Sequence, residues 1–127
     1  MEIISAKQWD IVITDERLEK IKPIPSELFK SFELDKVQRS LLLFAYETDS
    51  GEIDQWLDEL IEIENGYVEE ATTEIKIEIC DDDNKVLHTK VMKGCRLLDH
   101  TLKLDDSDGP AIHEIMLAYK TYERVQV

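Results

Sequence analysis

The second half of the chain, residues 72–127, alternates apolar and polar residues in three runs that acidic turns separate. A period of two is typical of strands with one buried face. In TTEIKIEIC the isoleucines form one face, and the charged residues Glu74, Lys76 and Glu78 form the other. The pattern predicts a hairpin over residues 73–92, a bend or bulge at Gly94, a further strand over 96–104 and a final long strand over 112–125. A final strand of that length is expected to pair with something.

The first half of the chain predicts two more strands, at 8–14 and 37–47. The second of these, VQRSLLLFAYE, carries a continuous apolar patch, so both of its faces are expected to be covered. Between them, Pro23 and Pro25 exclude a central strand or helix, and an extended loop with a short strand or helical turn is expected around 26–32. This segment is rich in apolar side chains that should be buried against the core or against a neighbouring subunit: Leu28, Phe29, Phe32 and Leu34.

One amphipathic helix is predicted over residues 51–63. Asp49 or Ser50 can cap its start, and Asn65-Gly66 can end it. Its apolar stripe has the spacing i, i+3, i+4, i+7, i+8 and comprises Ile53, Trp56, Leu57, Leu60 and Ile61. Together these elements predict an α+β fold that is mostly antiparallel β, a sandwich or partial barrel of five to six strands with one helix packed on the outside. The 127 residues are expected to form a single domain.

The chain is strongly acidic, with 29 acidic and 15 basic residues and a net charge of -14. Ordinary nucleic-acid binding needs clustered Lys and Arg, so this charge argues against it. It allows a surface that repels nucleic acid or one that meets a basic partner. No apolar run is long enough for a membrane span, no secretory signal is visible, and Cys80 and Cys95 are expected to be free thiols.

Catalytic and metal-binding signatures are not found in the sequence. The acidic clusters at 81–84 and 105–109 lack the spacing of a calcium-binding loop and are interpreted as polar turns. His88, His100 and His113, together with the two cysteines, show no CxxC or HxxxH spacing and do not cluster in the sequence, so no zinc site is expected. There is no GxSxG elbow either. We therefore expect no catalysis, no metal and no cofactor.

The order of elements resembles the tail tube proteins of contractile phage tails and related contractile injection systems. In that family a strand is followed by a helix, a hairpin with a polar turn, and a last strand that ends in an aromatic residue. The proline-bearing segment IKPIP, residues 21–25, is similar to the loop that precedes the family's second half. The other matching pieces are residues 41–47, 53–61, 73–83, 90–98 and 114–122.

The resemblance implies a structural subunit of a tail tube, found in the virion and made in the host cytoplasm. Its partners would be further copies of itself in stacked hexameric rings, the tail sheath and the baseplate, with DNA passing through without specific binding and with no membrane. In a closed barrel the polar face of Glu74, Lys76 and Glu78 would line the lumen, and Leu28, Phe29, Phe32 and Leu34 would lie between subunits.

Several alternatives stay open. A short N-terminal region and only four glycines allow a tube-fold baseplate or tube-initiating protein in place of the major tube subunit. An acidic DNA-mimic inhibitor and a small β-rich enzyme or ligand-binding module are the rival classes.

Overall fold

A computed structural model describes residues 8–15, 24–65, 73–104 and 109–126. Within these residues it contains seven strands, one α-helix and one short 3-10 helix. The bounds are β1 Trp9–Thr14, η1 Ser26–Leu28, β2 Phe29–Asp35, β3 Ser40–Tyr46, α1 Glu52–Asn65, β4 Thr73–Cys80, β5 Val86–Lys103, β6 Ile112–Ala118 and β7 Thr121–Gln126. The predicted α+β class with a mostly antiparallel sheet and one helix is confirmed, with one or two more strands than expected.

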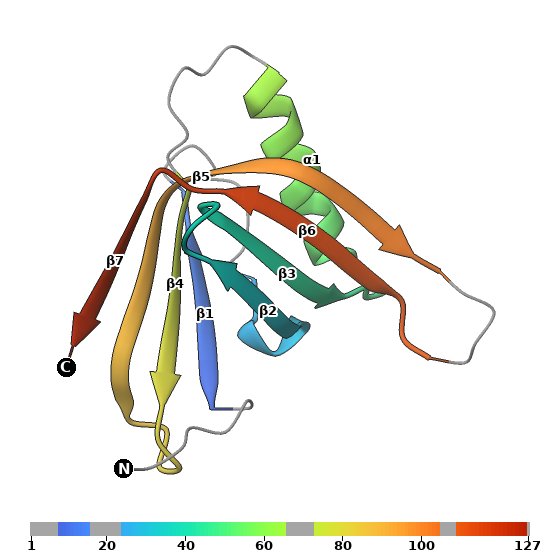
Figure 1. The fold of residues 1–127 in the computed structure, drawn as a ribbon. Coiled ribbons are helices and arrows are strands. Elements are labelled where there is room, and N and C mark those ends of the chain that lie inside the picture. Colours follow the sequence, from blue (N-terminus) through green and yellow to red (C-terminus); the bar gives the residue numbers. More distant parts are fainter. Residues whose placement is uncertain (1–7, 16–23, 66–72, 105–108, 127) are drawn as a thin grey trace.

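The strands form two antiparallel layers that share β5. In sheet A the order is β1-β4-β5-β7, and in sheet B it is β5-β6-β3-β2. The first half of β5 runs beside β4 and β7, and its second half crosses over to run beside β6, while α1 lies against sheet B (Figure 1). The two sheets therefore splay apart from a common line where β5 bends.

The expected break between residues 92 and 96 does not occur, because β5 continues through both sheets for 18 residues. Gly94 bends it with a φ of +68°, a conformation that costs glycine little. Near residue 126, by contrast, one predicted strand is divided into two. The single strand expected over 112–125 is divided at Tyr119 and Lys120 into β6 in sheet B and β7 in sheet A.

The segment after the two prolines is more regular than predicted. It starts as one 3-10 turn and continues as β2, which pairs with β3 along its length. The strand expected over 37–47 begins only at Ser40, because residues 36–39 form the hairpin turn. Asp35 Oδ1 accepts the N–H groups of Val37 and Gln38 in that turn, at 3.0 and 2.9 Å, and Arg39 has a φ of 53°.

The core lies between the sheets and the helix. Alternate residues of β4 are buried as predicted, with Ile75 and Ile77 fully covered. On β3 only one face is fully buried: Leu41, Leu43 and Ala45 have no exposure, whereas Leu42 and Phe44 stay partly exposed. The expectation that both faces of this strand are covered is therefore wrong for the single chain.

The helix buries the predicted stripe, since Ile53, Trp56, Leu57 and Leu60 are each 1% exposed. Ile61 lies at the edge of the stripe and is 42% exposed. The helix start is held by Thr48 and not by the predicted Asp49 or Ser50. The Thr48 hydroxyl accepts the N–H of Gly51 at 3.1 Å and donates to the Glu52 carboxylate. Gly66, the expected end of the helix, lies outside the described residues.

Candidate functional site

The outer face of sheet A is formed by the polar side of β4. Glu74, Lys76 and Glu78 point away from the buried isoleucines, and the Lys76 ammonium lies 3.8 Å from a Glu74 carboxylate oxygen. The strand register places Asp10, Val12 and Thr14 of β1 directly beside them, in that order opposite Glu78, Lys76 and Glu74. The three predicted lumen residues thus form one surface with the edge strand β1, which is polar except at Val12.

This face is weakly acidic. By register it carries the acids Asp10, Glu74, Glu78 and Glu123 and the bases Lys76 and Lys93, four against two. Exposed ion pairs such as Lys76 with Glu74 add little stability. These charges therefore contribute little to the stability of the fold and are exposed to solvent and to any molecule that passes this face.

The apolar segment predicted to lie between subunits packs mainly on its own core. Phe29 is 6% exposed, and Leu28, Phe32 and Leu34 pack partly buried against the same core. The Phe32 ring meets the Trp9 ring edge-on with centroids 4.8 Å apart. The sequence left open whether this segment packs on its own core or on a neighbouring subunit, and the structure shows packing on its own core. Contact with a neighbouring subunit stays a prediction for Leu28, Phe32 and Leu34, which are partly exposed.

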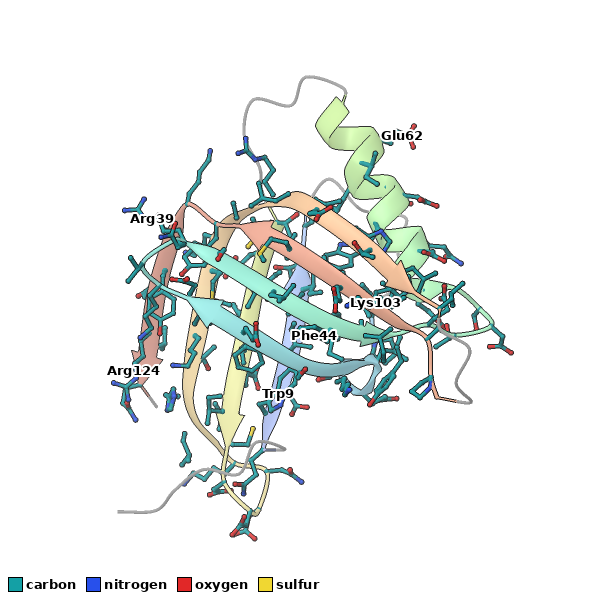
Figure 2. The ribbon with its side chains drawn as sticks, turned by 45° about the vertical axis from the view of Figure 1, so that its right-hand side comes forward. Trp9, Arg39, Phe44, Glu62, Lys103 and Arg124 are labelled. Carbon is teal, nitrogen blue, oxygen red and sulfur yellow. The ribbon has the colours of Figure 1, made fainter. Side chains whose placement is uncertain are left out.

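The outer face of sheet B carries more large apolar side chains, although by register it also holds the charged residues Glu33, Asp99 and Glu114. Leu42 and Phe44 of β3 alternate with the buried residues of that strand, and Met116 of β6 lies opposite Leu42. These three side chains are partly exposed, and Leu98 in the bulge of β5 is 54% exposed. Phe44 lies within this surface, and Lys103 lies toward the end of β5 (Figure 2). Glu114 and Lys103 form an ion pair of 2.9 Å there.

Strand β7 has little contact with the core. Five of its six residues are exposed, on both of its faces, and Val125 is 44% exposed. The inner face of this part of sheet A is cationic, because Lys90 lies opposite Arg124 and the Lys36 ammonium sits 4.9 Å from the Tyr122 ring centroid. This surface is thus locally positive, although the chain as a whole has a net charge of -14.

A cluster of histidines and carboxylates lies where α1 packs on sheet B. His100 Nε2 and His113 Nδ1 are 2.7 Å apart, and the two rings are stacked with centroids 5.0 Å apart. On its other side, His113 Nε2 lies 3.3 Å from Glu47 Oε2 and 3.9 Å from Asp54 Oδ1. Four separate elements therefore meet at one buried imidazole.

The two carboxyl groups of this cluster titrate together. A hydrogen bond with Glu47 raises the pKa of Asp54, and burial and the charge of Glu47 raise it further. Burial acts to raise the pKa of Glu47, but hydrogen bonds with Asp54 and with the Thr48 N–H, together with the nearby His113 imidazole, outweigh it and leave the value lowered. Burial, followed by the neighbouring His113, lowers the pKa of His100. Opposite pKa shifts in two neighbouring carboxyls are typical of groups that titrate as a pair.

The expectation that the histidines do not cluster is wrong for His100 and His113. Local spacing motifs miss them because they are 13 residues apart on two strands. The predicted strands 96–104 and 112–125 are joined by a short loop, and folding them into a hairpin brings these positions together. The register has His100 opposite Ile115 and His113 opposite Leu102. Hairpin pairing was therefore the available signal.

The other sites considered from the sequence behave as structural features. Asp81 Oδ1 accepts the backbone N–H groups of Asp83 and Lys85, both at 2.9 Å, and Asn84 adopts a φ of 62°, so this acidic cluster is a turn. Residues 105–108 of the second acidic cluster lie outside the described residues. Cys80 and Cys95 are buried free thiols, as predicted. No helix in the described residues is both long and apolar enough to cross a membrane.

Comparison with known proteins gives matches in structure only. No protein-family model and no curated protein matches the sequence. A chain of the anti-feeding prophage baseplate superposes with a TM-score of 0.71 at 11% identity, covering 100% of this chain and 97% of that one. A chain of the sheath-tube complex of the PVC extracellular contractile injection system gives 0.68 at 18% identity, covering 98% and 93%. Hcp1 from Flavobacterium johnsoniae gives 0.53 at 13% identity, covering 91% and 94%.

These matches cover nearly all of this chain and nearly all of each compared chain. The resemblance seen in the sequence is confirmed at the level of the fold: the chain has the tube fold of contractile injection systems. At such low identity the fold alone is transferred, and function has to be argued from the surfaces.

Proposed function

We propose that this chain is a structural, non-enzymatic subunit of a contractile injection machine, assembling with copies of itself into rings of its inner tube. The observation that carries the proposal is β7, a strand exposed on both faces with one edge unpaired among the described residues. An exposed strand edge is a template for pairing with another chain. Head-to-tail pairing of one surface with a different surface closes into a ring when the rotation allows it.

Sheet A ends in β7 on one side and in β1 on the other, and the β1 edge is partly covered because the Ile11 N–H donates to Ser26 Oγ at 3.0 Å. We propose that β7 of one subunit extends toward sheet A of the next, which would give a continuous barrel around a lumen. The apolar outer face of sheet B suits contact with protein, because burying Phe44, Leu42 and Met116 gains hydrophobic free energy. The polar outer face of sheet A suits contact with water, and we assign the lumen to it.

In this proposal the particle is phage-tail-like, the rings are hexameric, and sheath and baseplate proteins are the further partners. DNA, if it is the cargo, would pass an acidic wall without binding sites. A position in the baseplate or at a tube end is the second candidate. It is favoured by the likeness to the baseplate chain, and by the likeness to a chain in the sheath/tube terminator structure of the PVC system, with a TM-score of 0.70 at 17% identity.

The test is the assembly state of the purified full chain. Light scattering and negative-stain microscopy should reveal rings or stacked rings, alone or after addition of the machine's baseplate proteins. Val125→Pro should abolish assembly while the chain still melts cooperatively, because proline removes a strand N–H at an exposed position. Val125→Thr keeps the strand and is the matched control. A strictly monomeric chain under all these conditions contradicts the proposal and favours the DNA-mimic alternative.

A further inference from the structure

The histidine–carboxylate cluster has the chemistry of a metal site. Asp54, His100 and His113 each offer one ligand atom, and these atoms all lie within 4.8 Å of one another. Imidazole nitrogen with carboxylate oxygen is a donor set that suits zinc and its neighbours among the transition metals, whereas calcium and magnesium prefer oxygen alone. A tetrahedral zinc ion about 2.0–2.1 Å from each ligand spaces its ligands about 3.3 Å apart, so a cluster whose ligand atoms lie within 4.8 Å of one another needs to contract only slightly around the ion.

The fold positions these donors from separate elements. His100 and His113 come from neighbouring strands β5 and β6, and Asp54 comes from the first turn of α1. Glu47 follows the end of β3, with its Oε2 3.3 Å from His113 Nε2. Ligands drawn from two strands and a helix would bind an ion and tie the helix to the sheet at the same time.

An unsatisfied buried nitrogen points to the ligand. The His113 side chain is fully buried, and its Nε2 makes no hydrogen bond to any described residue, although Glu47 and Asp54 lie nearby in poor geometry. A buried polar atom left without a partner costs free energy. Beside it, carboxylate oxygens of Glu47 and Asp54 lie 3.3 and 3.9 Å from this nitrogen, so acceptors of a cation surround it.

We propose that Asp54, His100 and His113, with Glu47 beside them, bind one divalent transition-metal ion of the zinc class, which fastens α1 to sheet B. His113 would bind through its unpartnered Nε2 and His100 through its Nε2, which turns from its hydrogen bond with His113 Nδ1 toward the ion. The ion has a route in from solvent, because the Asp54 side chain is 47% exposed. The site is independent of the proposed ring assembly, since none of its residues lies on β7 or on the outer face of sheet A.

The experiment uses the full chain freed of metal with a chelator and then titrated with Zn²⁺. Calorimetry should give one ion per chain, and the melting temperature should rise by several degrees and fall again with EDTA. Co²⁺ in place of Zn²⁺ should give the intense visible absorption of a four-coordinate site with nitrogen ligands. Helix fastening predicts that amides of α1 gain protection from hydrogen exchange when the ion binds.

His100→Gln and Asp54→Asn are the informative variants, because His113 is fully buried and its replacement can unfold the chain. Each should weaken Zn²⁺ binding at least about tenfold. His88→Gln is the matched control, since His88 lies in sheet A opposite Ile79, and it should bind Zn²⁺ unchanged. The proposal is overturned if Zn²⁺ does not bind, if the stoichiometry is not one, or if His100→Gln and Asp54→Asn bind Zn²⁺ as tightly as His88→Gln does.

Discussion

Gly94 of β5 lies against the side chain of Lys120, one of the two residues that join β6 to β7. A Cβ placed on Gly94 would be 2.9 Å from Lys120 Cδ and 3.1 Å from Lys120 Cβ. The Lys120 N–H donates to the carbonyl of Lys93 at 2.9 Å, next to the same bend. Two segments of the chain pass from sheet B to sheet A: β5 at Gly94, and the connection between β6 and β7 at Lys120. Both therefore bend at this contact, which fixes the angle between the sheets.

Gly94→Ala should lower the free energy of unfolding by about 2–3 kcal/mol. A φ of +68° strains alanine by about 1–2 kcal/mol, and the stem of Lys120 must also move. Gly51→Ala is the control, because Gly51 has a φ of +67° but no described atom within 4 Å of its added Cβ. Denaturant melts that give equal losses for the two variants would contradict the packing part of this account.

Trp56→Ala should cost about 3–5 kcal/mol in the free energy of unfolding, because a large side chain that is 1% exposed leaves a cavity. Ile61→Ala on the same helix should cost under about 1 kcal/mol, since Ile61 is 42% exposed. Urea titrations of the two variants measure the difference. A loss below 1 kcal/mol for Trp56→Ala would mean that the stripe is not what holds the helix.

Periodicity in the sequence correctly predicted the elements that bury the same face along their whole length. The alternation around Ile75 and Ile77 and the stripe around Trp56 each need only one buried face, which the sequence displays directly. The continuity of β5 was not predictable in the same way. A glycine breaks the apolar pattern whether it ends a strand or bends it, and the contact with Lys120 that decides between them is tertiary.

The histidine cluster was missed, and the extent of β2 was underestimated, for a related reason. His100 and His113 meet only through the pairing of β5 with β6, which no local motif records. The segment after Pro25 forms a strand because β3 offers it an edge and Phe29 reaches the core, not because of local preference. What the sequence leaves open is thus the set of contacts between elements.

Alkaline pH should destabilise the fold through Cys95. Burial raises the pKa of this thiol from 9.0 to about 12, so between these values the folded chain holds a proton that the unfolded chain has lost. Stability falls with rising pH wherever the unfolded state binds fewer protons. The melting temperature should decline above about pH 9, and Cys95→Ala should decline less steeply, with Cys80→Ala as a second thiol control. Parallel declines for the unmodified chain and Cys95→Ala would assign the loss to other groups.

Phe44→Asp should reduce assembly without unfolding the chain. Phe44 lies on the partly exposed apolar face of sheet B, which we expect a neighbouring protein to cover. A buried carboxylate in such an interface carries a large desolvation cost. Gln55→Asp places the same charge on an exposed residue of α1, away from this face, and should assemble more readily. Light scattering compares the two variants, and equal assembly would remove this face from the interface.

Glu74→Lys combined with Glu78→Lys should make assembled particles retain DNA. These residues face away from the buried Ile75 and Ile77, and with Lys76 they leave a net negative charge per subunit that a closed ring repeats around its lumen. Reversing both charges creates a basic ring, and contacts between lysine and phosphate weaken as salt rises. Folding should be nearly unchanged, because surface substitutions shift the free energy of unfolding by under about 0.5 kcal/mol.

The matched control for that variant is Glu62→Lys combined with Asp83→Lys, which makes the same charge change at exposed positions on the helix and at a hairpin tip (Figure 2 labels Glu62). DNA release from the particles is measured across a range of salt concentrations for both. Only the Glu74 and Glu78 variant should hold DNA at low salt and release it at high salt. Release that is independent of salt, or equal retention by the control, would place the lumen on another face of the molecule.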